Sequence, residues 1–203
     1  MATRGQKVSL GLETRGGAAV SDVLNDLEKA PTGRLILPNL VAGMPLLVVV
    51  RLSVPPSAAG SPLAVRLAWD DPRGGGRRTL LASLDPLPAV PLAGWSASAV
   101  DPEVREQEAL MMVARAQKES SRAHERGDFA GTVSRLAESR AWAEGVPGTP
   151  MVEDELRAIA GLEQALNEGD PLAYRKMAKF RSYRRTTSQS APPPKPPEPP
   201  AGT

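Results

Sequence analysis

The sequence predicts an α+β protein, in which an N-terminal antiparallel β-sandwich is followed by four helices, arranged as two hairpins, and a disordered Pro-rich tail. Three observations predict this order. Apolar residues alternate with polar ones over much of the first 95 residues, they recur at helical spacing beyond residue 100, and proline dominates the end of the chain. The predicted domains are a β-sandwich over 1–95, an acidic helical segment over 101–185 and a tail over 186–203.

The β part is predicted from short segments with strand periodicity. Residues 8–12 alternate between apolar and polar, which is the pattern of a half-buried strand. Residues 18–27 are ambiguous, because their apolar spacing fits a helix whereas their β-branched residues and the flanking Gly and Pro fit a strand. A short strand is expected at 35–37, and the Val-rich run 46–54 is expected to be a central strand.

The clearest hairpin is expected over residues 63–84. Residues 63–69 alternate in the manner of a strand, the Gly-rich stretch 70–77 forms a turn longer than two residues, and 79–84 returns as a second strand. Five or six short strands separated by Gly and Pro turns are typical of an antiparallel sandwich. A Pro-rich connector over 85–100 then ends the β part.

The helical segment is predicted to begin at Asp101, a natural N-cap that is followed by Pro102 at the first helical position. This helix should run to about Glu125, and Asp128 should cap the next helix after the terminator Gly127. The apolar faces of these two helices are expected to include Val104, Leu110, Met111, Ala114, Phe129, Val133 and Leu136.

Two further helices and the tail complete the chain. A third helix is expected over 152–166, and Asp170 with Pro171 should start a fourth that ends at about Arg185. Seven of the thirteen residues over 191–203 are Pro, so this stretch should populate polyproline II and cannot build a core.

The composition argues against several classes of site. The chain has no Cys, which excludes disulfides, thiol nucleophiles, Fe–S clusters and Cys-based zinc sites. His124 is the single His, and without a second His or a Cys we interpret it as a solvated residue at a helix end. Neither Gly-x-Ser-x-Gly nor Gly-x-Gly-x-x-Gly occurs. We therefore expect no catalytic residue, no metal site and no cofactor.

The net charge of +2 hides a strong asymmetry. Residues 1–100 carry +3, residues 101–170 carry −7 and residues 171–203 carry +6. The cations at the basic end form a candidate patch: Arg175, Lys176, Lys179, Arg181, Arg184 and Arg185. With the aromatic residues interleaved among them, they could bind nucleic acid or anionic lipid, or they could dock on the acidic helices or stay solvated. Because the neighbouring acidic block would repel a polyanion, nucleic acid is the less favoured partner.

A set of segments in a fixed order carries a resemblance to a known family. The segments are Val8-Ser-Leu-Gly-Leu12, Val20-x-x-Val23-Leu-Asn-Asp-Leu-Glu28, Leu37-Pro-Asn-Leu-Val-Ala-Gly43, Val50-Arg-Leu-Ser-Val-Pro55, Val65-Arg-Leu-Ala-Trp-Asp70, a Gly-Asp joint between acidic helices and a Tyr-Arg-Lys…Tyr-Arg-Arg end. Together they resemble the C-terminal region of bacterial von Willebrand factor A (VWA) domain-containing proteins, over roughly residues 7–185. The resemblance implies a sandwich with a helical segment behind it, and it assigns residues 18–27 to a strand.

The same resemblance implies what this sequence lacks. The VWA domain of that family binds a divalent metal through Asp-x-Ser-x-Ser, and no such motif occurs here. The stretch before Lys7 is too short to hold a VWA domain. No metal ligand is therefore carried over. The resemblance implies that the chain is either a piece of a longer VWA protein or a stand-alone version of the region that follows the VWA domain.

We therefore expect a non-enzymatic protein-interaction or scaffold module, the accessory C-terminal region of a VWA-type protein. Its expected partner is a protein, namely a VWA domain in another chain or in a preceding part of a longer protein. No apolar run approaches the ~20 residues of a membrane span, and no leader pattern is visible, so a cytoplasmic bacterial protein is expected. The alternative function is polyanion binding through the basic helix 174–185.

Overall fold

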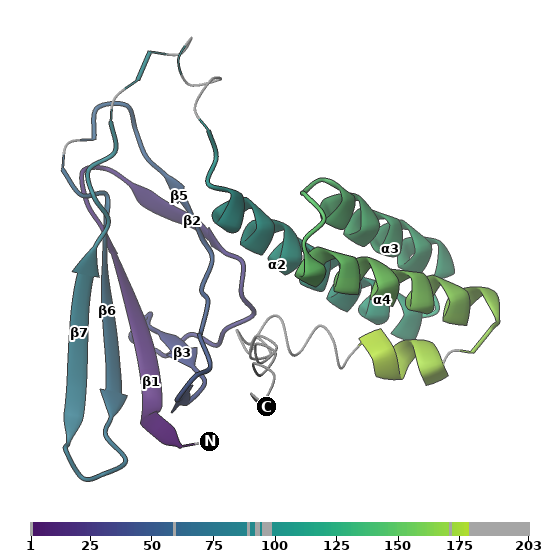
Figure 1. The fold of residues 1–203 in the computed structure, drawn as a ribbon, viewed down its shortest axis with the longest axis horizontal. Coiled ribbons are helices and arrows are strands. Elements are labelled where there is room, and N and C mark those ends of the chain that lie inside the picture. The colour runs from purple at the N-terminus through teal and green to yellow at the C-terminus, as the bar shows by residue number, and fades with distance from the viewer. Residues whose placement is uncertain are drawn as a thin grey trace, which may run out of the picture.

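The computed structural model describes residues 2–58, 60–88, 90–91, 94, 99–170 and 172–178. These residues form antiparallel β-strands that are followed by helices, which confirms the predicted order (Figure 1). The strands are β1 (Thr3–Thr14), β2 (Ala19–Val23), β3 (Leu35–Leu37), β4 (Leu40–Val41), β5 (Val50–Ser53), β6 (Leu63–Asp70) and β7 (Arg77–Ser83). The helices are α2 (Pro102–Glu125), α3 (Phe129–Glu144) and α4 (Pro150–Asn167), and residues 172–178 are also helical.

The strands form two antiparallel sheets. The larger one has the order β3-β1-β6-β7, with β4 also paired to β1, and the smaller one pairs β2 with β5. The predicted hairpin is confirmed, because β6 and β7 pair without interruption from Ala64 opposite Ser83 to Asp70 opposite Arg77. The ambiguous segment contains strand β2, as the family resemblance implied. Packing of the two sheets as the layers of a sandwich stays a prediction.

The predicted central strand over 46–54 is wrong. Only β5 within it is a strand, and β5 lies in the two-stranded sheet, while β1 takes the central place in the larger one. The cause is Asn25, whose Nδ2 donates to Leu47 O at 2.9 Å and whose Oδ1 accepts from Val49 N at 2.7 Å. Leu24 N also donates to Val49 O at 2.9 Å. These bonds occupy Leu47 O, Val49 N and Val49 O, two of them through the Asn25 side chain in place of a partner strand.

Three of the predicted helix starts agree with the structure, whereas α4 begins at Pro150, two residues before its predicted start, with Thr149 as its N-cap. The Asp101 carboxylate accepts from the backbone N–H of Glu103 and Val104, and Pro102 opens α2. Asp128 caps α3 by accepting from Gly131 N at 2.8 Å. The Asp170 carboxylate accepts from the first two N–H groups of the helical stretch 172–178. The remainder of the predicted fourth helix and the whole tail lie outside the described residues.

The predicted apolar faces are partly wrong. Val104, Phe129 and Val133 are exposed to 57%, 67% and 59%. The buried stripe of α3 instead consists of Thr132, Leu136, Ser139 and Ala143. Two hydrogen bonds join this stripe to α2: Ser120 Oγ of α2 donates to the backbone O of Thr132 at 2.7 Å, and Ser139 Oγ donates to the backbone O of Val113 at 3.4 Å. Short side chains let α2 and α3 approach closely. Because Thr132 and Ser139 are polar, the spacing of hydrophobic residues does not identify them as buried.

A single apolar core joins the helices. Its buried members include Leu110, Leu136, Ile159, Leu162 and Tyr174. The ring of Tyr174 is completely buried, and its hydroxyl lies 2.6 Å from Ser120 Oγ. Burial raises the pKa of Tyr174 above its ordinary value.

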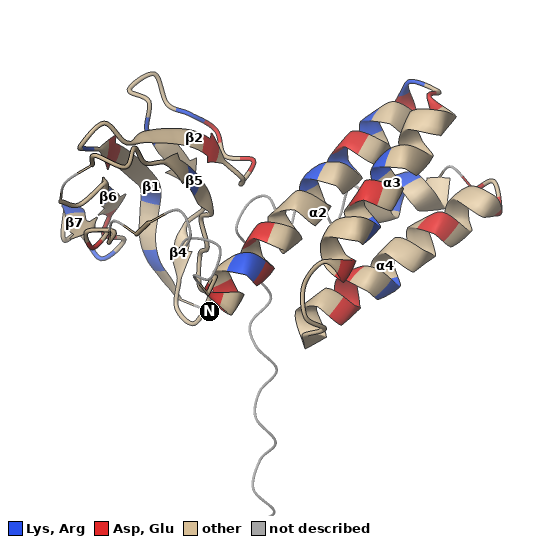
Figure 2. Cartoon of the chain, turned by 90° about the horizontal axis from the view of Figure 1, so that it is seen from above, with Lys and Arg blue, Asp and Glu red and all other residues tan. Residues whose placement is uncertain are grey.

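Charged groups join α2 to the β part. Arg115 Nη1 contacts Asp22 Oδ2 at 2.6 Å, and the same guanidinium donates to Val23 O at 2.6 Å and to Leu24 O at 2.9 Å. The hydrogen bond from Arg115 holds the pKa of Asp22 below its ordinary value. Arg51 Nη2 contacts Glu108 Oε1 at 2.8 Å, and Lys118 pairs with Asp26. Because of these contacts, α2 lies between the β part and the other helices (Figures 1 and 2).

Candidate interaction surface

The structure describes two of the six cations in the predicted basic patch. Arg175 and Lys176 lie in the helical stretch 172–178, and both are exposed. The preceding residue, Tyr174, lies in the same stretch but is buried. Lys179, Arg181, Arg184 and Arg185 lie outside the described residues.

Two acidic side chains of the helices on which the patch could dock already have other partners. Glu163 pairs with Arg140, and Glu106 Oε1 accepts from Thr149 Oγ1 at 3.0 Å. Within the ranges that the structure describes, no ion pair joins Arg175 or Lys176 to an acid. Docking of the basic patch on the acidic helices stays a prediction.

His124 is not the solvated residue that the sequence suggests. It is half-buried, with its ring centroid 4.7 Å from that of Tyr174 and 5.9 Å from that of Phe129. Its Nδ1 is buried and finds no hydrogen-bond partner among the described residues. The ring packs at the end of α2 as an aromatic side chain would. The described part of the chain holds no group of three or more His, Cys, Asp or Glu side chains able to share a metal ion.

An open hollow of about 450 Å³ lies between α2 and α3. Its wall includes Arg122, Arg126 and Arg135, but also Glu119 and Asp128. Arg135 pairs with Glu119 at 3.3 Å, and Asp128 serves as the α3 cap. Because carboxylates share this wall with the arginines, the hollow has no clear preference for a ligand of either sign.

The apolar face of the larger sheet is covered at one side and open at the other. One row of leucines crosses four strands, since Leu35 of β3 lies opposite Leu10 of β1, Leu10 lies opposite Leu67 of β6, and Leu67 lies opposite Leu80 of β7. Side chains directly opposite each other point to the same face. Leu35 is 2% exposed, Leu10 and Leu67 are half-buried, and Leu80 is 57% exposed. The described chain therefore covers this face only toward β3.

Strand β7 is exposed along its whole length. All of its residues are exposed, and it pairs with β6 alone within the described residues. Leu81 is 70% exposed and lies on the face opposite to Leu80, opposite Arg66. Leu84 and Leu87, just beyond the strand, are also exposed. In both orientations β7 is the outermost strand, on the side of the sheet that faces away from α2, α3 and α4 (Figures 1 and 2).

Ion pairs fix the turn that leads into β7. Arg77 Nη1 contacts Asp70 Oδ1 at 2.8 Å, and Arg78 Nε contacts Asp71 Oδ2 at 3.1 Å. The hydrogen bond from Arg77 lowers the pKa of Asp70, and that from the backbone N–H of Arg73 lowers the pKa of Asp71. The charges of β7 are thus gathered and paired at one end.

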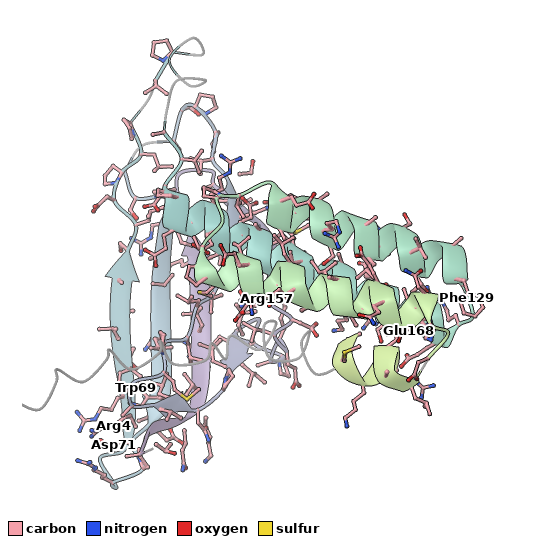
Figure 3. All side chains as sticks on the ribbon, turned by 45° about the vertical axis from the view of Figure 1, so that its right-hand side comes forward. Arg4, Trp69, Asp71, Phe129, Arg157 and Glu168 are labelled. Atoms are coloured by element: carbon pink, nitrogen blue, oxygen red, sulfur yellow. The ribbon has the colours of Figure 1, made fainter. Side chains whose placement is uncertain are left out.

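Trp69 packs over the neighbouring strand at this same end. A Cβ on Gly5 would lie 2.6 Å from Trp69 Cδ1, so only glycine fits beneath the ring. Trp69, Asp71 and Arg4 lie at this end of the β part, far from Phe129 at the opposite end of the helices (Figure 3). Leu80 and Leu81 of β7 therefore follow a turn that is held by the ion pairs of Arg77 and Arg78 on the β7 side and by the packing of Trp69 on the β6 side.

Sequence reasoning placed Leu80 and Leu81 in a strand but did not identify them as a surface. One signal could have revealed it. Two consecutive leucines interrupt the alternation of apolar and polar residues and put an apolar side chain on each face of the strand. What periodicity does not show is that the strand lies at an open edge.

The comparisons with known proteins give one likeness of structure. No protein-family model matches the chain, and no curated protein matches its sequence. The fold is similar to that of a protein described as von Willebrand factor type A from Catenulispora acidiphila, with a TM-score of 0.55 and 17% sequence identity. The match covers 93% of this chain and 47% of that one, so this chain spans about half the length of its structural neighbour.

This likeness confirms part of the family resemblance, since a VWA-type protein shares the fold. Which region of that protein corresponds to this chain stays a prediction. Separately, none of the described helices combines the length and the apolar character that crossing a bilayer requires.

Proposed function

We propose that this chain is a non-enzymatic protein-interaction module, the accessory C-terminal region of a VWA-type protein. One observation carries the proposal: the apolar row across the larger sheet goes from 2% exposed at Leu35 to 57% exposed at Leu80. Contiguous exposed apolar surface on a folded protein marks a site where another surface binds. The two sheets would form the layers of a sandwich whose open half receives the partner.

The surface is held by a fixed framework. Strand β7 is paired to β6 over its whole length, and the ion pairs of Arg77 and Arg78 hold the turn before it. The Arg115 contacts with Asp22 and with two backbone carbonyls tie α2 to the β part. A surface that is ordered before binding loses less conformational entropy when its partner arrives.

The proposed occupant is a VWA domain, in another chain or in a preceding part of a longer protein. The support is the likeness to a VWA-type protein of which this chain matches only 47%. The neighbour therefore contains further chain of about the same length. Because the sequence carries no Asp-x-Ser-x-Ser, any metal-dependent adhesion site would belong to that partner and not to this chain.

A non-catalytic role agrees with the placement of the only histidine. His124 packs against the rings of Tyr174 and Phe129 at the end of a helix. A cytoplasmic location in a bacterium belongs to the same proposal.

The proposal is tested by titrating the chain with a purified VWA domain in a calorimeter. The domain is taken from the reading frame directly upstream or, where that frame encodes none, from a VWA protein of the same genome. We expect saturable 1:1 binding that Leu80→Lys weakens by at least about tenfold, because the change places a charge on the apolar row. Leu172→Lys is the matched control, since Leu172 is 73% exposed at the far end of the helices. Absence of binding, or equal weakening by both variants, would contradict the proposal.

The alternative function, polyanion binding through 174–185, is distinguished from the proposed one by the salt dependence of the binding affinity. A phosphate-binding patch would bind a short DNA duplex or anionic vesicles with an affinity whose logarithm falls linearly with the logarithm of salt concentration. Changing Arg175 and Lys176 to Ala should weaken that binding. This result, with no binding to the VWA domain, would replace the proposed function by its alternative.

A further inference from the structure

We propose that the chain forms a two-fold dimer in which β7 of one copy pairs antiparallel with β7 of a second copy. The inference goes beyond the proposed function, because it uses the backbone edge of the sheet and needs no VWA domain. Its basis is the hydrogen-bonding direction of β7, the distribution of charge along this strand and the position of the strand in the fold.

The outer edge of β7 presents unpaired backbone groups. Leu84 N donates to Leu63 O at 2.8 Å, and Asp71 N donates to Gly76 O at 2.9 Å. These two bonds show which residues of β7 direct their backbone groups toward β6. Even-numbered residues of β7 therefore bond to β6, because successive residues of a strand direct their backbone groups to opposite sides. The N–H and C=O groups of Thr79, Leu81 and Ser83 point away from the sheet. Within the described ranges no strand pairs with them.

This edge lacks the features that usually protect an open strand. Such strands are commonly short, or they carry Pro, Lys or a bulge. Strand β7 has seven residues, contains no Pro and no Lys, and keeps a continuous register with β6. Its two arginines stand at the first two positions and are paired with Asp70 and Asp71. The stretch 79–83 is uncharged, long enough to accept another strand, and free to do so.

The sequence of β7 is complementary to itself in one antiparallel register. Pairing centred on Leu80 places Arg77 opposite Ser83 of the partner subunit and Thr79 opposite Leu81 of the partner subunit. Thr79 and Leu81 both point outward, so this register lets them exchange backbone hydrogen bonds. The arginines of the two copies lie at opposite ends, roughly 20 Å apart at about 3.4 Å per residue. A parallel arrangement would instead bring the like charges together.

The same register continues the apolar face. A two-fold axis perpendicular to the sheet keeps the two copies of Leu80 on one side, next to each other in a non-hydrogen-bonded pair. The leucine row would then run without interruption from one copy into the other. The edge lies on the side away from α2, α3 and α4, so a second sheet can approach without meeting the helices (Figures 1 and 2).

Sedimentation equilibrium of the full chain over a range of concentrations tests the dimer. We expect the weight-average mass to rise from 21.4 kDa toward twice that value. Leu81→Pro removes an outward N–H that β6 does not use, so it should stay at the monomer mass while its circular dichroism and thermal midpoint change little. Leu81→Lys should do the same. Ile36→Lys is the control, because Ile36 is also exposed, at 40%, but lies on the opposite edge strand.

A cysteine scan tests the register. The natural chain has no Cys, so a single introduced thiol can only form a disulfide with its copy. In a non-hydrogen-bonded antiparallel pair the Cα atoms lie about 4.5 Å apart, which suits a disulfide. Leu80→Cys should form a covalent dimer under mild oxidation, whereas Ser83→Cys should not, because its two copies would lie roughly 20 Å apart.

Three results would overturn the proposal: a monomer at every concentration, a dimer that survives Leu81→Pro, or equal cross-linking of Leu80→Cys and Ser83→Cys. These samples contain no VWA domain, so the dimer and the proposed function fail independently.

Discussion

The two edges of the larger sheet differ in what covers them. Strand β3 is three residues long, and the chain before it closes its outer side: Ile36 N donates to Glu28 O at 2.8 Å, and Lys29 bridges to Leu35. Strand β7 is seven residues long and has no such neighbour within the described residues. The leucine row that ends buried at β3 ends exposed at β7. The described core thus covers the sheet at β3 but leaves it exposed at β7, and this exposed part of the sheet is the candidate interaction surface.

The largest expected effect comes from comparing the two ends of that row. Leu35→Ala should lower the free energy of unfolding by about 2–4 kcal/mol, because it opens a cavity at a buried position. Leu80→Ala should change it by no more than about 0.5 kcal/mol, because this side chain is already mostly in water. Urea unfolding of both variants at a concentration where the protein is monomeric measures the difference. Similar losses at the two positions would show that β7 is covered after all.

A somewhat smaller effect is expected at Asn25, which fixes the segment before β5. Asn25→Ala should cost about 1–3 kcal/mol, because the change leaves the half-buried Leu47 O and Val49 N without their amide partner. An unchanged urea midpoint for Asn25→Ala would mean that another group holds this segment.

Acid should weaken the junction between α2 and the β part by a smaller amount. The pKa of Asp22 is lowered from its ordinary value of 3.8 by the hydrogen bond from Arg115, so the contact stabilises the fold above that value and is lost as pH falls through the lowered pKa. The side chains of this pair are about one third exposed, so the contribution is about 0–1 kcal/mol.

The variant that tests this contribution is Asp22→Asn. It should be less stable than the natural chain at neutral pH, and the difference should shrink below about pH 4. Urea unfolding at several pH values provides the comparison. A difference that is constant down to about pH 2 would exclude Asp22 as its source.

The smallest effect is expected from the described part of the basic patch. Changing Arg175 and Lys176 together to Ala should alter the free energy of unfolding by less than about 0.5 kcal/mol, since both side chains are exposed and unpaired among the described residues. A loss above about 1 kcal/mol, measured by urea unfolding, would indicate that the patch docks on the rest of the chain.

Local signals were sufficient to predict the order of strands and helices and three of the helix starts. Asp101, Asp128 and Asp170 each cap a helix through their own side chain, so their role can be recognised from a few neighbouring residues. Strand β1 and the β6–β7 hairpin follow from alternation along short segments.

What could not be predicted depends on contacts between distant residues. The run 46–49 has the composition of a strand, but the side chain of Asn25, more than twenty positions earlier, bonds to Leu47 O and Val49 N. The face of α3 was misassigned because its buried stripe contains the polar residues Thr132 and Ser139, and hydrophobic spacing does not show that Thr132 O and Ser139 Oγ form hydrogen bonds with α2. The openness of β7 likewise follows from strand order, which a strand's own residues do not encode.

Amide hydrogen exchange at the two edges tests the central claim most directly. In a dilute sample the outward N–H groups of Thr79, Leu81 and Ser83 should exchange rapidly, while the N–H of Ile36, bonded to Glu28 O, should be protected. Raising the protein concentration or adding the VWA domain should slow exchange along β7 and leave Ile36 unchanged. Exchange along β7 that is already slow when dilute, or that neither addition alters, would contradict the account of β7 as an open interaction surface.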